Sequence, residues 1–161
     1  MSRTSIGAVI QALNIDEPAV RTEGSPYDKL HHIEEHNHSP SLCYPTLVDG
    51  VPVTAGAAGP PWVLGAFTEI VPALAIGDEF DIHFISIEDL DDVTVYELHL
   101  YYGAGDTFCG SVRFTKTANL EGTQNVNFMT PLIPADSRIR AKLASDAGGS
   151  IATISIMYHT Y

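Results

Sequence analysis

Four histidines lie close together in residues 30–46, a stretch that reads LHHIEEHNHSPSLCYPT. His36 and His38 are two residues apart, and in an extended chain residues two apart point to the same side. Their imidazole nitrogens could bind one ion, because imidazole is a common ligand of zinc and of other transition metals. These residue types therefore predict either a metal site or a stretch that binds a partner.

The surroundings of His36 and His38 favour partner binding. The pair resembles the H-x-H motif of the cupins, double-stranded β-barrels that hold a metal with this pair and a later glutamate and histidine. In that family the motif follows a glycine-rich turn inside the barrel strands. Here Ser39–Pro40 comes after the pair, and the pair precedes the strand-rich region. We expect no metal and no cofactor, with a cupin-like metal-binding enzyme that uses His36 and His38 as the alternative.

No other pattern in the sequence predicts catalysis. A serine nucleophile on a strand-to-helix turn needs the motif G-x-S-x-G, which this sequence lacks. The acidic pairs Glu34–Glu35 and Asp91–Asp92 consist of adjacent residues, which point apart on an extended chain and cannot share a proton. We expect no catalytic residues, and the chain is predicted not to be an enzyme.

The charge of the chain limits its partners. The 161 residues carry a formal net charge of −12. Nucleic-acid binding needs a basic face that displaces counterions from phosphates, and anionic lipid repels an acidic chain. No apolar run reaches the roughly 18 residues of a membrane span, and the first residues lack the apolar run of a signal peptide. We expect a protein made in a cytosol that binds neither nucleic acid nor membrane.

The second part of the chain is patterned as short strands separated by turn residues. In residues 93–102 the alternation predicts that Tyr96, Leu98 and Leu100 face inward and that Glu97, His99 and Tyr101 face outward. In residues 137–144 it predicts that Ile139, Ala141 and Leu143 face inward, and in residues 150–161 it predicts one face made by Ala152, Ile154, Ile156 and Tyr158. Such segments recur at intervals of roughly 10–15 residues, the spacing of a sandwich or barrel. We predict an all-β fold over residues 46–161, an antiparallel, jelly-roll-like β-sandwich of about eight strands. Residues 1–45 are predicted to form an extended N-terminal arm with at most one short helix.

Turn and breaker residues predict details of the first strands. Asp49–Gly50 between apolar residues indicates a hairpin with a tight turn. Pro52 has no N–H to donate, so this hairpin must lie at a sheet edge. Residues 62–71 predict a long strand in which Gly65 marks a bulge or a close approach of another backbone.

Two later strands carry less regular patterns. In residues 80–87 the alternation shifts after Phe84, which predicts a β-bulge. In residues 108–117 the alternation predicts one face made by Phe108, Gly110, Val112 and Phe114 and another made by Cys109, Ser111, Arg113 and Thr115.

Aromatic residues could supply contacts with a partner. Tyr44 lies within the histidine stretch, and Trp62, the sole tryptophan, begins a strand, where a core or rim position is the alternative. Tyr161 ends the chain inside a strand pattern and could contact another subunit. The predicted partner-binding residues are His36, His38, Tyr44, Trp62 and Tyr161.

The order of these segments resembles a group of virion structural proteins of tailed bacteriophages. The similar motifs are H-x-H-x-P, YPTL-x-DG, WVLGAFTEIVPA, FDIHFISIE, TPLIPADSRIRAKLAS and ATISIMYHTY, which cover roughly residues 27–161. The resemblance implies a non-enzymatic capsid decoration or cement protein with a jelly-roll-like sandwich. It also implies a homo-oligomer, expected to be a trimer, that binds and stabilises the major capsid protein lattice. Its place would be the capsid surface of the virion, after synthesis in the host cytoplasm.

A third class of function stays open beside the capsid protein and the metalloenzyme. A receptor- or glycan-binding fibre module would expose aromatic side chains at one loop end and would bind glycans without any capsid.

Overall fold

The structure is a computed structural model of the chain, and it describes residues 41–57, 62–118 and 123–161. Most of the predicted arm, with its possible helix, therefore lies outside the described residues. No helix in these ranges is long and apolar enough to cross a membrane. The strands of the described residues are β1 (Leu42–Tyr44), β2 (Val51–Thr54), β3 (Thr68–Val71), β4 (Phe80–Leu90), β5 (Val95–Tyr102), β6 (Thr107–Thr115), β7 (Gln124–Asn127), β8 (Ile139–Ser145) and β9 (Ile151–Thr160).

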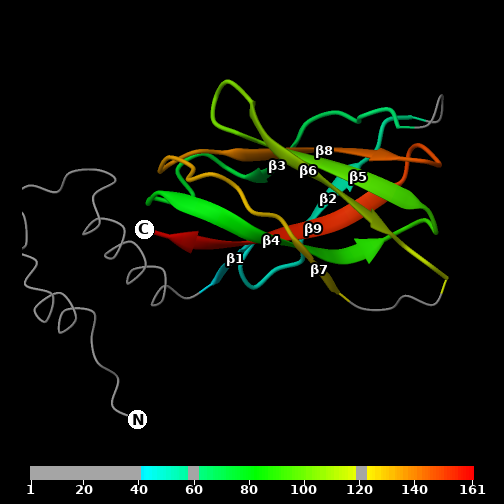
Figure 1. Cartoon of the computed structure of the whole chain (residues 1–161), viewed down its shortest axis with the longest axis horizontal. Coiled ribbons are helices and arrows are strands. Elements are labelled where there is room, and N and C mark those ends of the chain that lie inside the picture. The colour runs from blue at the N-terminus through cyan, green and yellow to red at the C-terminus, as the bar shows by residue number, and fades with distance from the viewer. Residues whose placement is uncertain (1–40, 58–61, 119–122) are drawn as a thin grey trace, which may run out of the picture. The chain divides into compact units, whose positions relative to one another are not determined.

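These strands form two antiparallel sheets, which confirms the predicted all-β sandwich. The four-stranded sheet has the order β3-β8-β5-β6, and the five-stranded sheet has the order β1-β9-β4-β7 with β2 also paired to β9. Figure 1 shows the sheets as two layers, with β3, β8, β5 and β6 above β4, β9 and β7. Most neighbours within a sheet are far apart in sequence, as β4 and β9 are, so most pairing is non-local.

The core lies between the sheets and is built by alternate residues of each strand. The predicted inward rows of β5 and β8 are confirmed, and the row predicted to share one face of β9 also faces the core. Burying one such aliphatic side chain contributes about 1.5–3 kcal/mol. The members of these rows with no exposed surface are Tyr96, Leu98 and Leu100 in β5, Ile139, Ala141 and Leu143 in β8, and Ala152, Ile154 and Ile156 in β9.

The predicted hairpin at Asp49–Gly50 is wrong. β1 and β2 do not pair with each other, because both pair antiparallel with β9, opposite its end and its beginning. They are two parts of one interrupted edge strand, which also explains how Pro52 is tolerated. Gly50 is required for close packing, since a Cβ there would lie 2.6 Å from the carbonyl oxygen of Ile154. Sheet pairing starts at Leu42, ahead of the predicted boundary at residue 46.

The predicted long strand over residues 62–71 is also wrong, since only Thr68–Val71 forms a strand. The preceding segment is held by single hydrogen bonds to different partners, such as Gly65 N–H to the Leu143 carbonyl at 2.8 Å. The predicted close approach at Gly65 is confirmed, because a Cβ there would overlap the carbonyl oxygen of Thr54. The segment therefore follows the sheet without joining it as a ladder.

Bulges set which side chains of β4 and β6 face outward. In β4 the register shifts between Ile82 and Phe84, so the predicted bulge is confirmed, but it begins before Phe84. In β6 the register shifts opposite Leu100 and Tyr101, so that Tyr101 pairs with Phe108. Phe108 is consequently 53 % exposed whereas Phe114 is buried, so the prediction that the two share a face is wrong.

Candidate functional site

The outward side chains of the four-stranded sheet form cross-strand rows on its solvent side. Leu98 and Leu100 of β5 are fully buried, and the side chains that alternate with them must point away from the core. We call this side the outer face. Its rows, each given from β8 through β5 to β6, are Arg140–Tyr101–Phe108, Lys142–His99–Ser111 and Ala144–Glu97–Arg113.

Aromatic rings gather at one end of the outer face. The ring of Tyr101 meets Phe67 edge to face at 5.0 Å between centroids and Phe108 at 5.5 Å. The imidazole of His99 lies 5.4 Å from Phe108 in the same kind of geometry. Edge-to-face contacts at these distances are favourable. The aromatic cluster, defined as Phe67, His99, Tyr101 and Phe108, therefore has fixed ring orientations on a rigid sheet.

The irregular segment before β3 supplies two of the rings on this face. Phe67 lies under two cations, with Arg140 Cζ at 4.1 Å and Lys142 Nζ at 4.2 Å from its ring centroid. Trp62 has Arg113 Cζ at 4.6 Å from its ring. Such cation–π contacts contribute about 0.5–1 kcal/mol at exposed sites. Both rings are thus held in place while each keeps 36 % of its surface exposed.

Carboxylates orient the basic side chains of the outer face. Glu97 binds His99 Nε2 at 2.7 Å through one oxygen and Arg113 Nε at 2.5 Å through the other. The hydrogen bond with His99, and then the one with Arg113, holds the pKa of Glu97 below its usual range. Asp106 pairs in the same way with Arg140 and lies 3.4 Å from Arg138 Nη2. Glu97 therefore remains ionised at neutral pH, and both carboxylates keep the arginines in defined positions.

This arrangement can bind a flat, polyhydroxylated ligand. Exposed rings offer apolar surface for the C–H side of such a ligand, and the charged groups beside them can exchange hydrogen bonds with its hydroxyls. Arg113, Arg140 and Lys142 all stand on this face although the chain as a whole is acidic.

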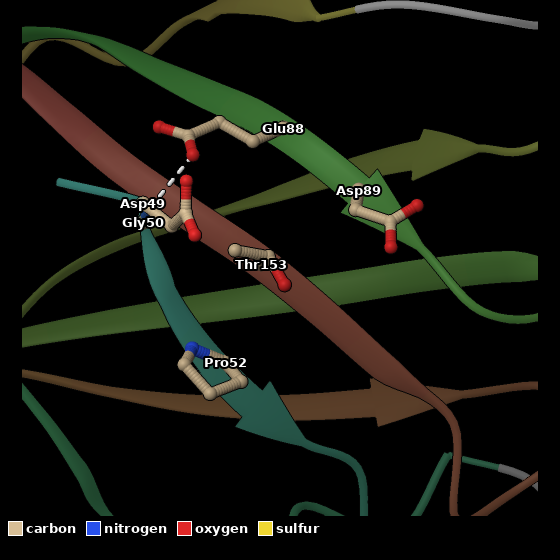
Figure 2. Close-up of a pocket in the computed structure, with 6 residues that line it drawn as sticks. All are labelled: Asp49, Gly50, Pro52, Glu88, Asp89 and Thr153. Carbon is tan, nitrogen blue, oxygen red and sulfur yellow. Dashed lines mark hydrogen bonds between the residues drawn. The ribbon is translucent and has the colours of Figure 1, made fainter.

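A hollow lies on the other sheet, and two of the carboxylates that line it already accept hydrogen bonds. Its lining residues, drawn in Figure 2, are Asp49, Gly50, Pro52, Glu88, Asp89 and Thr153. One oxygen of Glu88 accepts from Gly50 N–H at 2.7 Å, and the other accepts from the hydroxyl of Ser155. Asp89 accepts the N–H of the next residue at 2.8 Å. Glu88 therefore ties the loop before β2 to the sheet, and we assign the hollow a structural role.

The structure does not bring the predicted partner-binding residues together. His36 and His38 lie outside the described residues. Tyr44 is half-buried in β1 and packs against the core, whereas Trp62 stands on the outer face of the other sheet. Tyr161 is half-buried, and its hydroxyl donates to Asp81 at 3.0 Å. Their roles in partner binding stay predictions.

Sequence reasoning missed the residues that do converge. It placed His99 and Tyr101 outward in their strand, but it treated them only as the solvent side of a sheet. It placed Phe108 on the same face as Phe114 and counted Phe67 as part of a regular strand. The available signal was the presence of His99 and Tyr101 at alternate, outward positions of one strand. Whether such side chains form a site depends on which strands are neighbours in the sheet.

No family model matches the sequence, and no curated protein matches it. Two solved structures are similar to the chain, each with a TM-score of 0.36. One is a carbohydrate-binding module (CBM6cm-2) of Cellvibrio mixtus lichenase 5A in complex with cellotriose, at 13 % identity over 76 % of this chain and 88 % of that one. The other is the C-terminal CBM6 of LamC, a marine laminarinase from Zobellia galactanivorans, at 12 % identity over 76 % of this chain and 100 % of that one.

These similar structures are carbohydrate-binding modules and not virion proteins. On this finding the predicted function as a capsid decoration or cement protein, bound to the major capsid protein, is wrong. The trimer and the virion location that the same resemblance implied stay predictions.

Proposed function

We propose that this chain is a non-catalytic carbohydrate-binding domain that holds a short oligosaccharide on the outer face of the β3-β8-β5-β6 sheet. The observation that carries the proposal is the aromatic cluster together with Trp62, exposed and held in place beside paired charged groups. This corresponds to the glycan-binding class left open by the sequence, with the rings on a sheet face instead of a loop end.

The chemistry of a sugar ring matches the outer face in two respects. One side of a pyranose presents mainly C–H groups, which pack on an aromatic face, and its rim presents hydroxyls, which both donate and accept hydrogen bonds. Glu97 and Asp106 supply acceptors, and Arg113 supplies donors that are 66 % exposed. Few, well-placed polar groups beside apolar surface are typical of small-molecule sites.

The size of the face suits an oligosaccharide rather than one sugar. The rows of Glu97 and Tyr101 are four residues apart along β5, a distance of about 14 Å at a rise of about 3.4 Å per residue. Trp62 lies at the Glu97 end, through Arg113, and Phe108 lies at the Tyr101 end. Rings at both ends of the strip allow successive sugars to pack on separate aromatic surfaces.

Cross-strand pairs could stabilise the sheet without binding anything, because aromatic and charged pairs contribute about 0.2–1 kcal/mol each in any sheet. The exposure of Phe108 distinguishes the two interpretations. With 53 % of its surface exposed, its ring contributes little burial to the fold. Its removal should therefore affect binding much more than stability.

The test is glycan-array screening of the whole chain, followed by calorimetry with the best oligosaccharide and with cellotriose. We expect saturable binding that Phe108→Ala and Trp62→Ala each weaken by about tenfold or more, the range of an anchoring aromatic side chain. Met129→Ala is the matched control, because Met129 is an apolar side chain that is 77 % exposed and adjoins β4 on the other sheet. Absence of any glycan ligand, or unchanged affinity in both aromatic variants, would contradict the proposal.

A further inference from the structure

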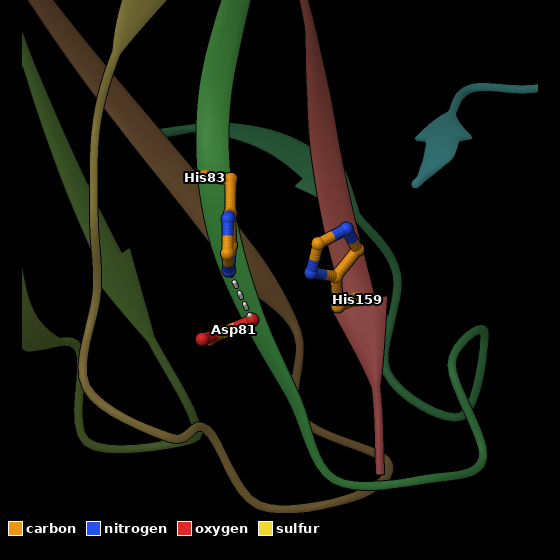
Figure 3. A group of neighbouring side chains, drawn as sticks. All are labelled: Asp81, His83 and His159. Carbon is orange, nitrogen blue, oxygen red and sulfur yellow. Dashed lines mark hydrogen bonds and ion pairs between the residues drawn. The ribbon is translucent and has the colours of Figure 1, made fainter. Parts of the chain in front are cut away.

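A second group of side chains with potential chemistry lies on the five-stranded sheet, where β4 and β9 meet. Asp81 in β4 is directly opposite His159 in β9, and His83 is two residues further along β4. Figure 3 shows the three side chains side by side, with His83 reaching back to Asp81 along its own strand. One potential ligand atom from each residue lies within 4.8 Å of those of the other two.

The distances fit a metal site after small side-chain rotations. Asp81 Oδ1 lies 2.9 Å from His83 Nε2, and the two imidazole rings are 4.2 Å apart between centroids. Zinc binds nitrogen and oxygen ligands at about 2.0–2.2 Å in a tetrahedron, which places the ligand atoms about 3.3 Å from one another. The side chains of Asp81 and His83 are only 15 % and 19 % exposed, so water competes weakly for their ligand atoms.

Neighbouring hydroxyls orient two of these three side chains. Tyr161 donates to Asp81 Oδ2 at 3.0 Å, which leaves the other carboxylate oxygen directed at His83. Ser41 Oγ lies 2.7 Å from His159 Nε2 and restrains that ring. Outer groups of this kind orient metal ligands in known sites.

We propose that Asp81, His83 and His159 bind a divalent transition-metal ion, zinc in the first place, across strands β4 and β9. Two imidazoles and one carboxylate are ligands that suit zinc and neighbouring first-row metals. Three protein ligands leave a fourth position for water. The ion would fasten the last residues of the chain to β4, and the site lies on the sheet opposite the one that bears the outer face.

The test measures zinc binding to the whole chain by calorimetry and by the shift in melting temperature. We expect one site that is lost in His83→Gln and in His159→Gln. We expect it to be retained in the matched control His36→Gln/His38→Gln, which removes two histidines of the N-terminal stretch. Zinc should raise the melting temperature of the wild type and of this control but not of the other two variants, because only a ligand bound to the folded state stabilises it. Tyr161→Phe should weaken binding by about 10–100-fold.

Three results would overturn the proposal. These are the absence of zinc, cobalt and nickel binding in the wild type, full binding in His83→Gln and His159→Gln, and loss of all binding in the His36/His38 control. Should the glutamine variants not fold, Asp81→Asn decides the question, because it keeps the side-chain shape and a hydrogen bond to Tyr161. A folded Asp81→Asn chain, checked by circular dichroism, supports the proposal if zinc binding is lost and overturns it if binding persists.

Discussion

Gly65→Ala should destabilise the protein and disturb the candidate glycan site together. A Cβ on residue 65 would overlap the carbonyl oxygen of Thr54 and lie 3.1 Å from the carbonyl carbon of Ala55. Both atoms belong to the backbone, so no side-chain rotation relieves the contact. Residue 65 also lies between Trp62 and Phe67, the two rings that this segment places on the outer face.

The loss of unfolding free energy in Gly65→Ala can be worked out from the contacts that the added methyl group disrupts. If residue 65 moves off the sheet, the hydrogen bond from its N–H to the Leu143 carbonyl at 2.8 Å is lost, which costs about 0.5–1.5 kcal/mol. Forcing an extra methyl group against packed backbone adds typically about 1–3 kcal/mol. We therefore expect Gly65→Ala to lower the free energy of unfolding by about 2–4 kcal/mol.

Chemical denaturation followed by the fluorescence of Trp62 and by far-UV circular dichroism measures this change. Gly77→Ala is the matched control, because nothing lies within 4 Å of a Cβ at that position. There we expect no loss, and at most a gain of about 1 kcal/mol through the less flexible unfolded chain. A Gly65→Ala variant as stable as the Gly77→Ala variant would show that the close approach does not restrict this position.

Three further changes test other parts of the structure. Tyr96→Phe removes a hydroxyl that donates to the Asp92 carbonyl at 2.8 Å and accepts its N–H at 3.0 Å, so equilibrium unfolding should show a loss of about 1–3 kcal/mol. Because the pKa of Glu97 is lowered, chiefly by His99, its contribution to stability is present above the ordinary carboxyl pKa and disappears as pH falls through the folded value. In His99→Gln a carboxyl NMR titration should show the pKa of Glu97 rising, and less stability should be lost as the pH falls below the ordinary carboxyl pKa; an unchanged titration would contradict the assigned cause. Burial raises the pKa of Cys109 to about 12, so its thiol should react with a disulfide reagent far more slowly than the exposed cysteine of β1 until the chain unfolds.

Alternation along a strand was readable from the sequence where the strand is regular. The row Tyr96, Leu98 and Leu100 was predicted inward and is fully buried. In this segment each apolar side chain is flanked by polar or amphipathic ones, so only one face could enter a core. The local pattern was sufficient here because side chains of an uninterrupted strand alternate between its two faces.

Pairing between strands was not readable in the same way. Asp49–Gly50 has the composition of a hairpin turn, yet the chain on either side pairs with β9, about a hundred residues later. The advantage of those pairings lies in contacts with residues that no local window contains. For the same reason the sequence around Asp81 does not indicate that His159 lies directly opposite it.

Both candidate sites depend on a β-bulge, which explains why the alternation of residues along each strand did not predict them. Phe114 of β6 faces the core, and strict alternation from it would turn Phe108 inward as well. The extra residue Cys109 reverses the phase and adds Phe108 to the outer face. In β4 the same device lets Ile85 enter the core while His83, two residues earlier, lies outside it beside Asp81. A bulge interrupts the hydrogen-bond ladder to redirect a side chain, so its presence beside both groups favours a function for each beyond folding.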